Sequence, residues 1–279
     1  MQGIVKKNNG ELWLEEFESN GFKASYKIND IIYSEKSKFQ EISIVDSEMF
    51  GKILVLDGIV QTTALDGHIY NEMISHIPIL THSNPKNILV IGGGDCGVVS
   101  ELAKYDFVEN IDLVEIDELV VSSCKEHLQE ISNNISDQRI NYLFEDGAKY
   151  VKEKQNHYDL VIVDSSDPIG PAEILFRYDF YKDIYNSLKY DGVMVCQSQS
   201  PIFHMDVLTQ SYNNIKELFN ESKLYTAVVP TYPGGLWSFT LGSKQDINID
   251  TSKLSPNTRY INKDILHSCF KLPKFINLD

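Results

Sequence analysis

The chain has 279 residues, of which 42% are hydrophobic and 23% charged, the balance of a soluble globular protein with one large or two modest domains. Its 40 acidic residues against 25 basic ones give a net charge of −15, which argues against nucleic acid and anionic membranes as partners, because both bind basic surfaces. No apolar run approaches the length of a membrane span, and the first residues lack the apolar stretch of a signal peptide, so we expect a cytoplasmic protein.

The first 65 residues are expected to form a small antiparallel β-strand domain. Short apolar runs are separated there by turn-forming pairs such as Asn20-Gly21 and Asp57-Gly58. Strands are expected at residues 12–14, 22–28, 31–33, 42–45 and 53–56.

From residue 66 to residue 279, strand and helix patterns alternate, which predicts an α/β domain with a doubly wound parallel sheet. A helix at residues 69–80 precedes its first strand. Residues 225–230 and 237–242 are expected to pair as a hairpin, and a short apolar helix or tail follows from residue 261. The other expected strands lie at residues 87–91, 111–115, 140–144, 158–164 and 192–197, and the other helices begin near residues 98, 117, 148 and 177 or span 206–219.

Two carboxylates follow the expected strand at residues 158–164. Asp164 ends this strand, and Asp167 comes three residues later in a loop with Pro168 and Gly170. Ligands of open α/β sheets bind beyond the carboxyl ends of the strands, so this pair suits a cationic ligand and a proton acceptor. The alternative is a helix cap followed by a solvated turn acid, which this spacing alone does not exclude.

A glycine-rich loop follows the expected strand at residues 87–91. Gly92, Gly94 and Gly97 form a G-x-G-x-x-G pattern, in which glycine lets a ligand approach the main chain. The pattern is formally compatible with NAD, but Asp95 would lie where a pyrophosphate binds, and like charges repel. A methionine-derived nucleoside fits better because it carries no phosphate.

Asp95 also distinguishes between two such nucleosides. The amino-acid tail of S-adenosylmethionine carries a carboxylate, and two charges ~4 Å apart interact by roughly 4 kcal/mol at an effective dielectric near 20. That energy corresponds to about a thousandfold in affinity. A decarboxylated tail carries only an ammonium group, which Asp95 would attract.

Two further acids occupy strand ends. Glu115 ends the strand after the glycine loop, 20 residues beyond Asp95, where an acid commonly binds ribose hydroxyls. Asp146 and Gly147 follow the third strand and are placed to receive an adenine amino group. One acid after each of three successive strands is a more specific signal than the glycine loop alone.

The cysteines and histidines indicate no metal site. The four cysteines lie far apart, and no Cys/His spacing suggests zinc. Cys96 either fills the glycine loop as a small residue or is a reactive thiol at a helix N-terminus. Surface or satisfied core positions without ligand or catalytic roles are expected for His68, His76, His82 and His204.

With these residues assembled, the chain resembles the spermidine synthases, which are polyamine aminopropyltransferases. The resemblance covers nearly the whole chain, and the sequence GLWSF at residues 235–239 is similar to the bacterial branch. The matching stretches are LVLDGIVQTT (54–63), GGGD (92–95), VEID (114–117), EDG (145–147), VDSSDPIGPAE (163–173) and PTYPGG (230–235).

The resemblance implies that a Rossmann-like domain of the methyltransferase type follows the β-strand domain in the chain. It also implies a homodimer or homotetramer. It implies transfer of the aminopropyl group of decarboxylated S-adenosylmethionine to putrescine, which yields spermidine and 5′-methylthioadenosine. The donor is a co-substrate, so no bound cofactor and no metal are expected.

The resemblance also assigns roles to residues. Asp164 would be the general base, and residues 165–173 would act as a lid. From the residues alone, Tyr70 fits a position in the core as well as one in the site. Gln197 and Gln199 fit the diamine pocket or an ordinary loop equally well. The implied nucleoside and aminopropyl site consists of Gln40, Gln61, Gly92, Gly94, Asp95, Glu115, Asp146, Gly147 and Pro171, and the implied diamine site of Tyr70, Asp95, Asp164, Asp167, Tyr232 and Trp237.

Four residues depart from the family's pattern, namely Gly67, His68, Asn71 and Cys96. They lie near the implied aminopropyl and diamine sites, so acceptors such as agmatine, cadaverine or spermidine stay open beside putrescine. A catalytically weak polyamine- or nucleoside-binding relative and an S-adenosylmethionine methyltransferase stay open as well.

Overall fold

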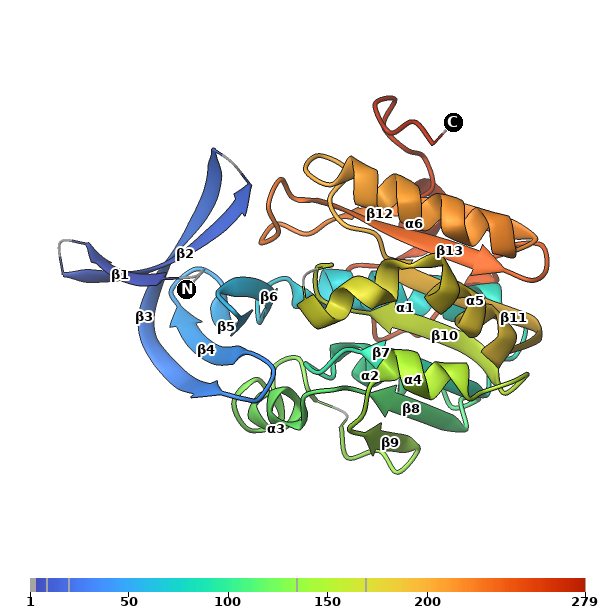
Figure 1. Cartoon of the computed structure of the whole chain (residues 1–279), viewed down its shortest axis with the longest axis horizontal. Coiled ribbons are helices and arrows are strands. Elements are labelled where there is room, and N and C mark those ends of the chain that lie inside the picture. Colours follow the sequence, from blue (N-terminus) through green and yellow to red (C-terminus); the bar gives the residue numbers. More distant parts are fainter. Residues whose placement is uncertain (1–3, 9, 20, 134, 169, 279) are drawn as a thin grey trace.

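The computed structural model describes residues 4–8, 10–19, 21–133, 135–168 and 170–278. Their strands form two sheets, one with six strands and one with seven, and the smaller sheet lies beside one end of the larger (Figure 1). Among these residues no helix is long and apolar enough to cross a membrane.

The N-terminal sheet is an antiparallel meander whose strands pair in chain order. Alternate apolar side chains on its buried face, such as Leu14, Tyr26 and Ile28, form a small core of their own. The predicted boundary between residues 65 and 66 falls between the last strand of this sheet and the first helix, and it stays a prediction. The strands are β1 (Ile4–Asn8), β2 (Glu11–Ser19), β3 (Phe22–Lys36), β4 (Glu41–Ser47), β5 (Gly51–Leu56) and β6 (Ile59–Thr63).

One prediction for this sheet is wrong. Residues 22–28 and 31–33 do not form two strands separated by a turn, because both belong to the single strand β3. The pairing of β3 with β4 shifts register on either side of Asp30, and such bulges bend a strand without ending it. The turn-forming pair Asn29-Asp30 therefore lies within the strand. The side chain of Asn29 donates to Asp46 Oδ2 at 2.9 Å across the sheet.

The larger sheet has the order β12-β13-β11-β10-β7-β8-β9. Its five strands from β11 to β9 are parallel, and β13 runs antiparallel to both β11 and β12. This arrangement confirms the predicted α/β fold class and the C-terminal hairpin. The strands are β7 (Asn87–Gly92), β8 (Asn110–Val114), β9 (Ile140–Leu143), β10 (Tyr158–Asp164), β11 (Leu188–Gln197), β12 (Glu221–Val228) and β13 (Leu236–Ser243).

Helices cover both faces of the larger sheet (Figure 1). In β7, Ile88 and Val90 pack with α1 and α2, whereas Leu89 and Ile91 pack on the side of α4, α5 and α6, as the two-residue period of a strand requires. The helices are α1 (Gly67–Thr81), α2 (Gly97–Leu102), α3 (Glu118–His127), α4 (Gly147–Lys152), α5 (Tyr178–Ser187), α6 (Met205–Leu218) and α7 (Lys263–Ser268), with 3-10 turns η1 (Gly170–Phe176) and η2 (Thr251–Lys253).

A separate apolar cluster joins the N-terminal sheet to helix α3. Ile42, Ile44 and Leu54 of the N-terminal sheet pack against Val120 and Cys124 of α3. This contact holds the N-terminal sheet over the carboxyl ends of the parallel strands. The fold therefore encloses the edge at which α/β proteins bind their ligands.

Candidate active site

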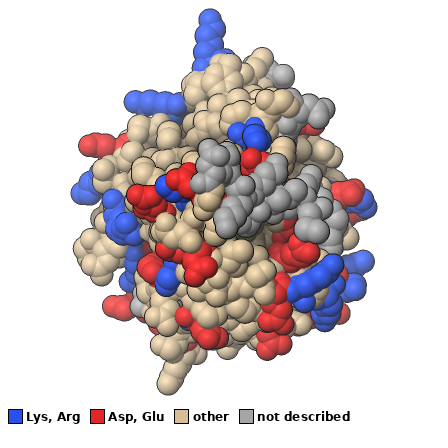
Figure 2. All heavy atoms as spheres, turned by 90° about the vertical axis from the view of Figure 1, so that its left-hand side faces the viewer, with Lys and Arg blue, Asp and Glu red and all other residues tan. Residues whose placement is uncertain are grey.

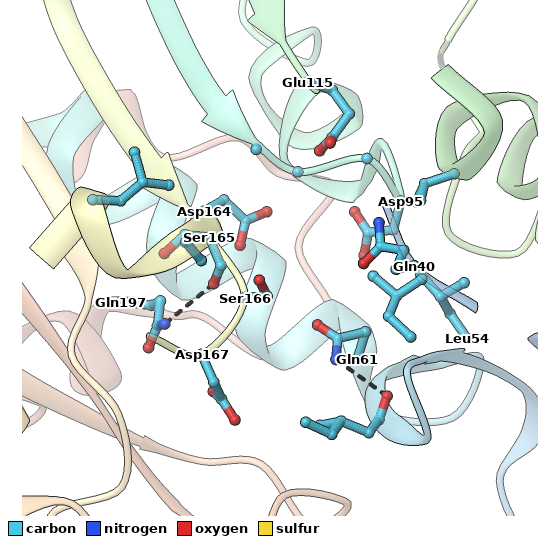
Figure 3. A pocket seen from close by; sticks show the side chains of 18 of the residues that line it. Gln40, Leu54, Gln61, Asp95, Glu115, Asp164, Ser165, Ser166, Asp167 and Gln197 are labelled. Atoms are coloured by element: carbon cyan, nitrogen blue, oxygen red, sulfur yellow. Dashed lines mark hydrogen bonds between the residues drawn. The ribbon is translucent and has the colours of Figure 1, made fainter. Parts of the chain in front are cut away.

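A cavity of about 590 Å³ lies between the carboxyl ends of the parallel strands and the N-terminal sheet (Figure 3). Its described lining includes many acidic side chains and no Lys, Arg or His. Such a lining concentrates negative potential and suits a cationic ligand. The acidic residues of the lining are Glu16, Glu18, Asp57, Asp95, Glu115, Asp146, Asp164 and Asp167.

Two glycines at the end of β7 let β10 pass close beside it. Gly92 and Gly93 adopt φ angles of +81° and +72°, which side chains rarely permit. A Cβ atom at Gly92 would lie 2.2 Å from the carbonyl oxygen of Asp164. The N–H of Gly93 donates to this carbonyl oxygen at 2.9 Å, so the glycine loop fixes the main chain at Asp164.

Asp164 ends β10 and points into the cavity (Figure 3). The hydroxyl of Tyr70 donates to Asp164 Oδ1 at 2.6 Å. Burial and the neighbouring Asp95 carboxylate raise the pKa of Asp164 to about 7. A carboxyl with this pKa takes up a proton readily near neutral pH, as a general base must.

Tyr70 belongs both to the core and to the site. Its ring packs against Phe239 and Tyr232, with centroid distances of 5.3 and 5.8 Å, while its hydroxyl reaches Asp164. The core role and the site role that the sequence leaves open for Tyr70 are therefore compatible. Packing of the ring fixes the direction of the hydrogen bond, which orients the carboxylate.

Asp95 reaches the cavity from the loop before α2 (Figure 3). Its Oδ1 accepts the N–H of Gly97 at 2.8 Å. Burial raises the pKa of Asp95, and this hydrogen bond opposes the rise. The carboxylates of Asp95 and Asp164 repel each other, so a ligand cation near both would relieve the repulsion.

The other strand ends supply the residues expected to hold a nucleoside. Glu115 Oε1 accepts the N–H of Asp117 at 2.9 Å, and burial raises the pKa of Glu115 to about 7. Asp146 lines the cavity and also caps α4, since its Oδ1 accepts the N–H groups of Ala148 and Lys149. The cavity thus brings Glu115 and Asp146 to the same side as the glycine loop.

Asp167 lies beyond Asp164, where the lining becomes aromatic. Gln199 Nε2 donates to Asp167 Oδ1 at 2.8 Å, and burial raises the pKa of Asp167. The rings of Tyr232 and Trp237 line the same cavity, and their centroids lie 4.6 Å apart. Carboxylate and ring faces together suit the far ammonium group of an extended amine. Gln197 lines the cavity as well, and its Nε2 donates to the carbonyl of Ser165 at 3.1 Å.

Three further residues of the predicted site are Gln40, Gln61 and Pro171. Gln40 lines the cavity, but its amide donates to Asp117 Oδ2 at 3.0 Å. Gln61 lines the cavity too; its side-chain amide donates to the carbonyl of Ile59, and its main-chain carbonyl accepts the hydroxyl of Tyr232 at 2.7 Å. Pro171 lies in η1, and its side chain is outside the described part of the chain.

Two residues that no sequence motif indicated, Glu16 and Glu18, line the cavity from β2. Glu16 Oε2 accepts the hydroxyl of Tyr26 at 3.2 Å, and burial raises the pKa of Glu16 to about 8. Alternate residues of a strand share a face, so Glu16 and Glu18 continue the face of the buried Leu14. Acids in phase with a buried apolar residue were the signal that the sequence offered.

Three of the residues that depart from the family's pattern, Gly67, Asn71 and Cys96, are tightly packed. A Cβ atom at Gly67 would lie 2.2 Å from Thr62 Oγ1, and one at Gly97 would lie 2.0 Å from Asn71 Nδ2. Cys96 is fully buried with a φ angle of +65°, and burial raises the pKa of its thiol to about 12. This thiol therefore stays protonated and fills the loop, as the simpler of the two sequence interpretations expects.

Two of the histidines have partners that the sequence does not reveal. His76 is a satisfied core residue, with Nε2 2.9 Å from Glu101 Oε2. His204 Nε2 lies 2.5 Å from Glu18 Oε1 at one end of the cavity.

One group of metal-ligating side chains lies away from the cavity. His82, Asp159 and Asp191 gather near the amino end of β10. The ammonium of Lys189 lies 2.8 Å from Asp159 Oδ1, and the other oxygen of Asp159 accepts the N–H groups of residues 86 and 87. An ammonium and two N–H donors thus already satisfy Asp159, so nothing in this geometry calls for a metal ion.

The free protein is expected to lose stability as the pH rises from about 5 to about 8, because its cavity carboxyls have raised pKa values. The pKa values of Glu115 and Asp164 are about 7 and that of Glu16 about 8, against ordinary values of 4.5, 3.8 and 4.5. Between these limits the folded state binds more protons than the unfolded state, so alkali favours unfolding. Thermal unfolding midpoints across this range would check the slope, which Asp164→Asn should reduce; a midpoint that rises with pH would contradict it.

Together these features define a class of protein, a Rossmann-like α/β fold of the methyltransferase type whose acidic cavity is closed by an antiparallel sheet. The model of the spermine/spermidine synthase domain matches residues 67–253, and that of the spermidine synthase tetramerisation domain matches residues 12–64. The chain belongs to the spermine/spermidine synthase family of polyamine aminopropyltransferases.

Relatives match over almost the full chain. The polyamine aminopropyltransferase of Clostridium kluyveri is 45% identical over 95% of this chain and 98% of its own length. That of Methanocaldococcus jannaschii is 43% identical over 95% and 94%. The crystal structure of spermidine synthase from Thermotoga maritima superposes with a TM-score of 0.90 at 33% identity, covering 99% of this chain and 96% of that one. A spermidine synthase in complex with the transition-state analogue AdoDATO gives a TM-score of 0.93 at 34% identity, covering 99% and 97%. The family predicted from the sequence is thus confirmed.

Proposed function

We propose that this protein transfers the aminopropyl group of decarboxylated S-adenosylmethionine to putrescine and releases spermidine and 5′-methylthioadenosine. The observation that carries the proposal is the position of Asp164. This carboxyl has a pKa raised to about 7, is oriented by Tyr70, and shares one cavity with Asp95 and Asp167. The related spermidine synthase that binds AdoDATO supports a donor of this kind.

The donor would occupy the side of the cavity with the glycine loop. Glu115 would accept the ribose hydroxyls, and Asp146 and Gly147 would receive the adenine. The aminopropyl ammonium would lie at Asp95, whose carboxylate attracts a cation and repels the carboxylate of intact S-adenosylmethionine. This repulsion disfavours a methyltransferase, because a methyltransferase uses intact S-adenosylmethionine.

The acceptor would approach from the side of Asp167, Tyr232 and Trp237. Its reacting amine is mostly protonated in water near neutral pH, with a pKa near that of lysine, about 10. Asp164 would take up the proton and aim the free nitrogen at the carbon bound to sulfur. A nitrogen–carbon bond then forms as the carbon–sulfur bond breaks, and the sulfonium leaves as the neutral thioether. No step needs a metal or a bound cofactor, and inversion at the carbon is expected.

Putrescine is the proposed acceptor because the carboxylates follow one another along the cavity. Asp164 would serve the reacting nitrogen, and Asp167 with the two rings would serve a second ammonium. Agmatine, cadaverine and spermidine are the competing acceptors. A catalytically weak relative that only binds polyamines is the competing class of protein. The hydrogen bond by which Tyr70 orients Asp164 argues against it.

A turnover assay tests this proposal. Purified protein is incubated with decarboxylated S-adenosylmethionine and a panel of these amines, and 5′-methylthioadenosine is quantified. The expected result is amine-dependent release that is fastest with putrescine. Release that is fastest with another amine would reassign the acceptor, and tight nucleoside binding without release for any amine would contradict the enzyme and favour the binding protein.

A homotetramer and cytoplasmic residence complete the proposal. The lid predicted at residues 165–173 includes residue 169, which lies outside the described residues. Figure 2 faces the N-terminal sheet and shows wide uncharged areas between acidic and basic side chains. Phe17, Ile31 and Ile32 of this sheet are 47%, 42% and 39% exposed, which is typical of a surface covered in an assembly. Solution mass would test the assembly, and cell fractionation the location.

A further inference from the structure

Glu18 and His204 form an ion pair at the acceptor side of the cavity. Glu18 lines the cavity from β2, and its Oε1 lies 2.5 Å from Nε2 of His204, the residue just before α6. The side chains of Glu18 and His204 are 12% and 32% exposed. The pair is therefore partly sheltered from water and less screened than an exposed pair, and it joins β2 to the segment before α6.

Three carboxylates, those of Glu16, Glu18 and Asp167, line this end of the cavity, and the imidazole of His204 lies against Glu18 outside the lining. Glu18 and Asp167 both raise the pKa of Glu16, which shows that the three acids share one field. The hydrogen bond that His204 donates to Glu18 raises the pKa of His204, with smaller contributions from Asp167 and Asp206. Burial raises the pKa of Asp167, and the charge of His204 opposes part of that rise. His204 thus offsets part of the negative charge that an amine would meet here.

The segment that carries His204 is held in place by packing. The ring of Phe203 stacks on Phe22 of β3 with a centroid distance of 5.1 Å. On its other side, a Cβ atom at Gly234 would lie 2.9 Å from Phe203 Cε2. Gly234 follows Tyr232 and Pro233, which line the cavity, so the segment stands directly behind the acceptor wall.

We propose that His204 determines the length of the acceptor, because by pairing with Glu18 it removes the carboxylate that a third ammonium group would need. Asp164 and Asp167 remain for the two nitrogens of a diamine. A linear triamine such as spermidine would place its last ammonium toward Glu18, which is already neutralised. This inference rests on the proposed aminopropyl transfer to a diamine and adds the residue that excludes a triamine.

The test compares spermidine with putrescine as acceptors in three variants. In His204→Ala, Glu18 is freed, and the ratio of kcat/KM for spermidine to kcat/KM for putrescine is expected to rise by about five- to tenfold. In Glu18→Gln with His204→Ala, no carboxylate is freed, so the rise should disappear. His127→Ala is the matched control, because His127 also pairs with a glutamate, Glu126, but lies on α3 away from the acceptor side. Its ratio should stay at the wild-type value.

The outcomes separate this inference from the proposed function. Wild-type protein that releases no nucleoside with any amine would overturn both. Wild-type protein that uses putrescine, with a ratio unchanged in His204→Ala, would overturn the inference alone. So would an equal fall for both amines together with a lower unfolding midpoint, since the pair would then act only as a structural contact. A rise that persists in the double variant would also overturn it, because the charge of Glu18 would not be the cause.

Discussion

Replacing Asp164 by Asn is expected to lower the rate of amine-dependent nucleoside release by about 10²- to 10⁴-fold, the usual contribution of a positioned general base. The amide is close in size to the carboxylate and can still accept the hydrogen bond that Tyr70 donates at 2.6 Å. It cannot take up the proton of the attacking amine. The loss should therefore fall on the chemical step, and the donor site should remain intact.

Three measurements check this result. Release of 5′-methylthioadenosine with saturating putrescine gives the rate, and calorimetric titration with the donor gives the affinity. In wild-type protein the rate should rise with pH through about 7 as Asp164 loses its proton, and this limb should vanish in the variant. Asp179→Asn, on the exposed first turn of α5, is the control and should keep the wild-type rate. A variant of Asp164 with wild-type turnover would assign the base elsewhere.

Replacing Asp95 by Asn is expected to reduce the preference for the decarboxylated donor over S-adenosylmethionine by about a hundredfold. The full interaction of two close charges is about a thousandfold, and solvent in the open cavity screens part of it. The change has two components, since the ammonium of the decarboxylated donor loses an attraction and the carboxylate of the intact donor loses a repulsion. The amide oxygen of the asparagine would still accept the N–H of Gly97, so the loop should hold its shape.

The dissociation constants of both nucleosides, measured for wild type and variant, give this ratio directly. Asp179→Asn again serves as the control and should leave the ratio at the wild-type value. Equal weakening of both nucleosides would mean that Asp95 supports the loop without reading the tail. An unchanged ratio would remove the electrostatic argument for the decarboxylated donor.

The acids at the strand ends show which features of the site local sequence patterns predict. Asp164 and Glu115 were placed correctly at the edge of the sheet because apolar runs identify parallel strands, and parallel strands end together. The long strand β3 was predicted as two strands because Asn29 and Asp30 are turn formers locally. Pairing with β4 overrides that preference through bulges, and pairing is a property of residues far apart in the chain.

The fold class, the family and the acids at the ends of the parallel strands follow from periodicity and short motifs in the chain. Packing of the N-terminal sheet against the rest of the fold brings Glu16 and Glu18 of β2 into the same cavity as Asp164. It also pairs Glu18 with His204, across 186 positions of the chain. Contacts between separate sheets depend on how the sheets pack together, which no local pattern of residues records, and the environment that sets the pKa of Asp164 arises in the same way.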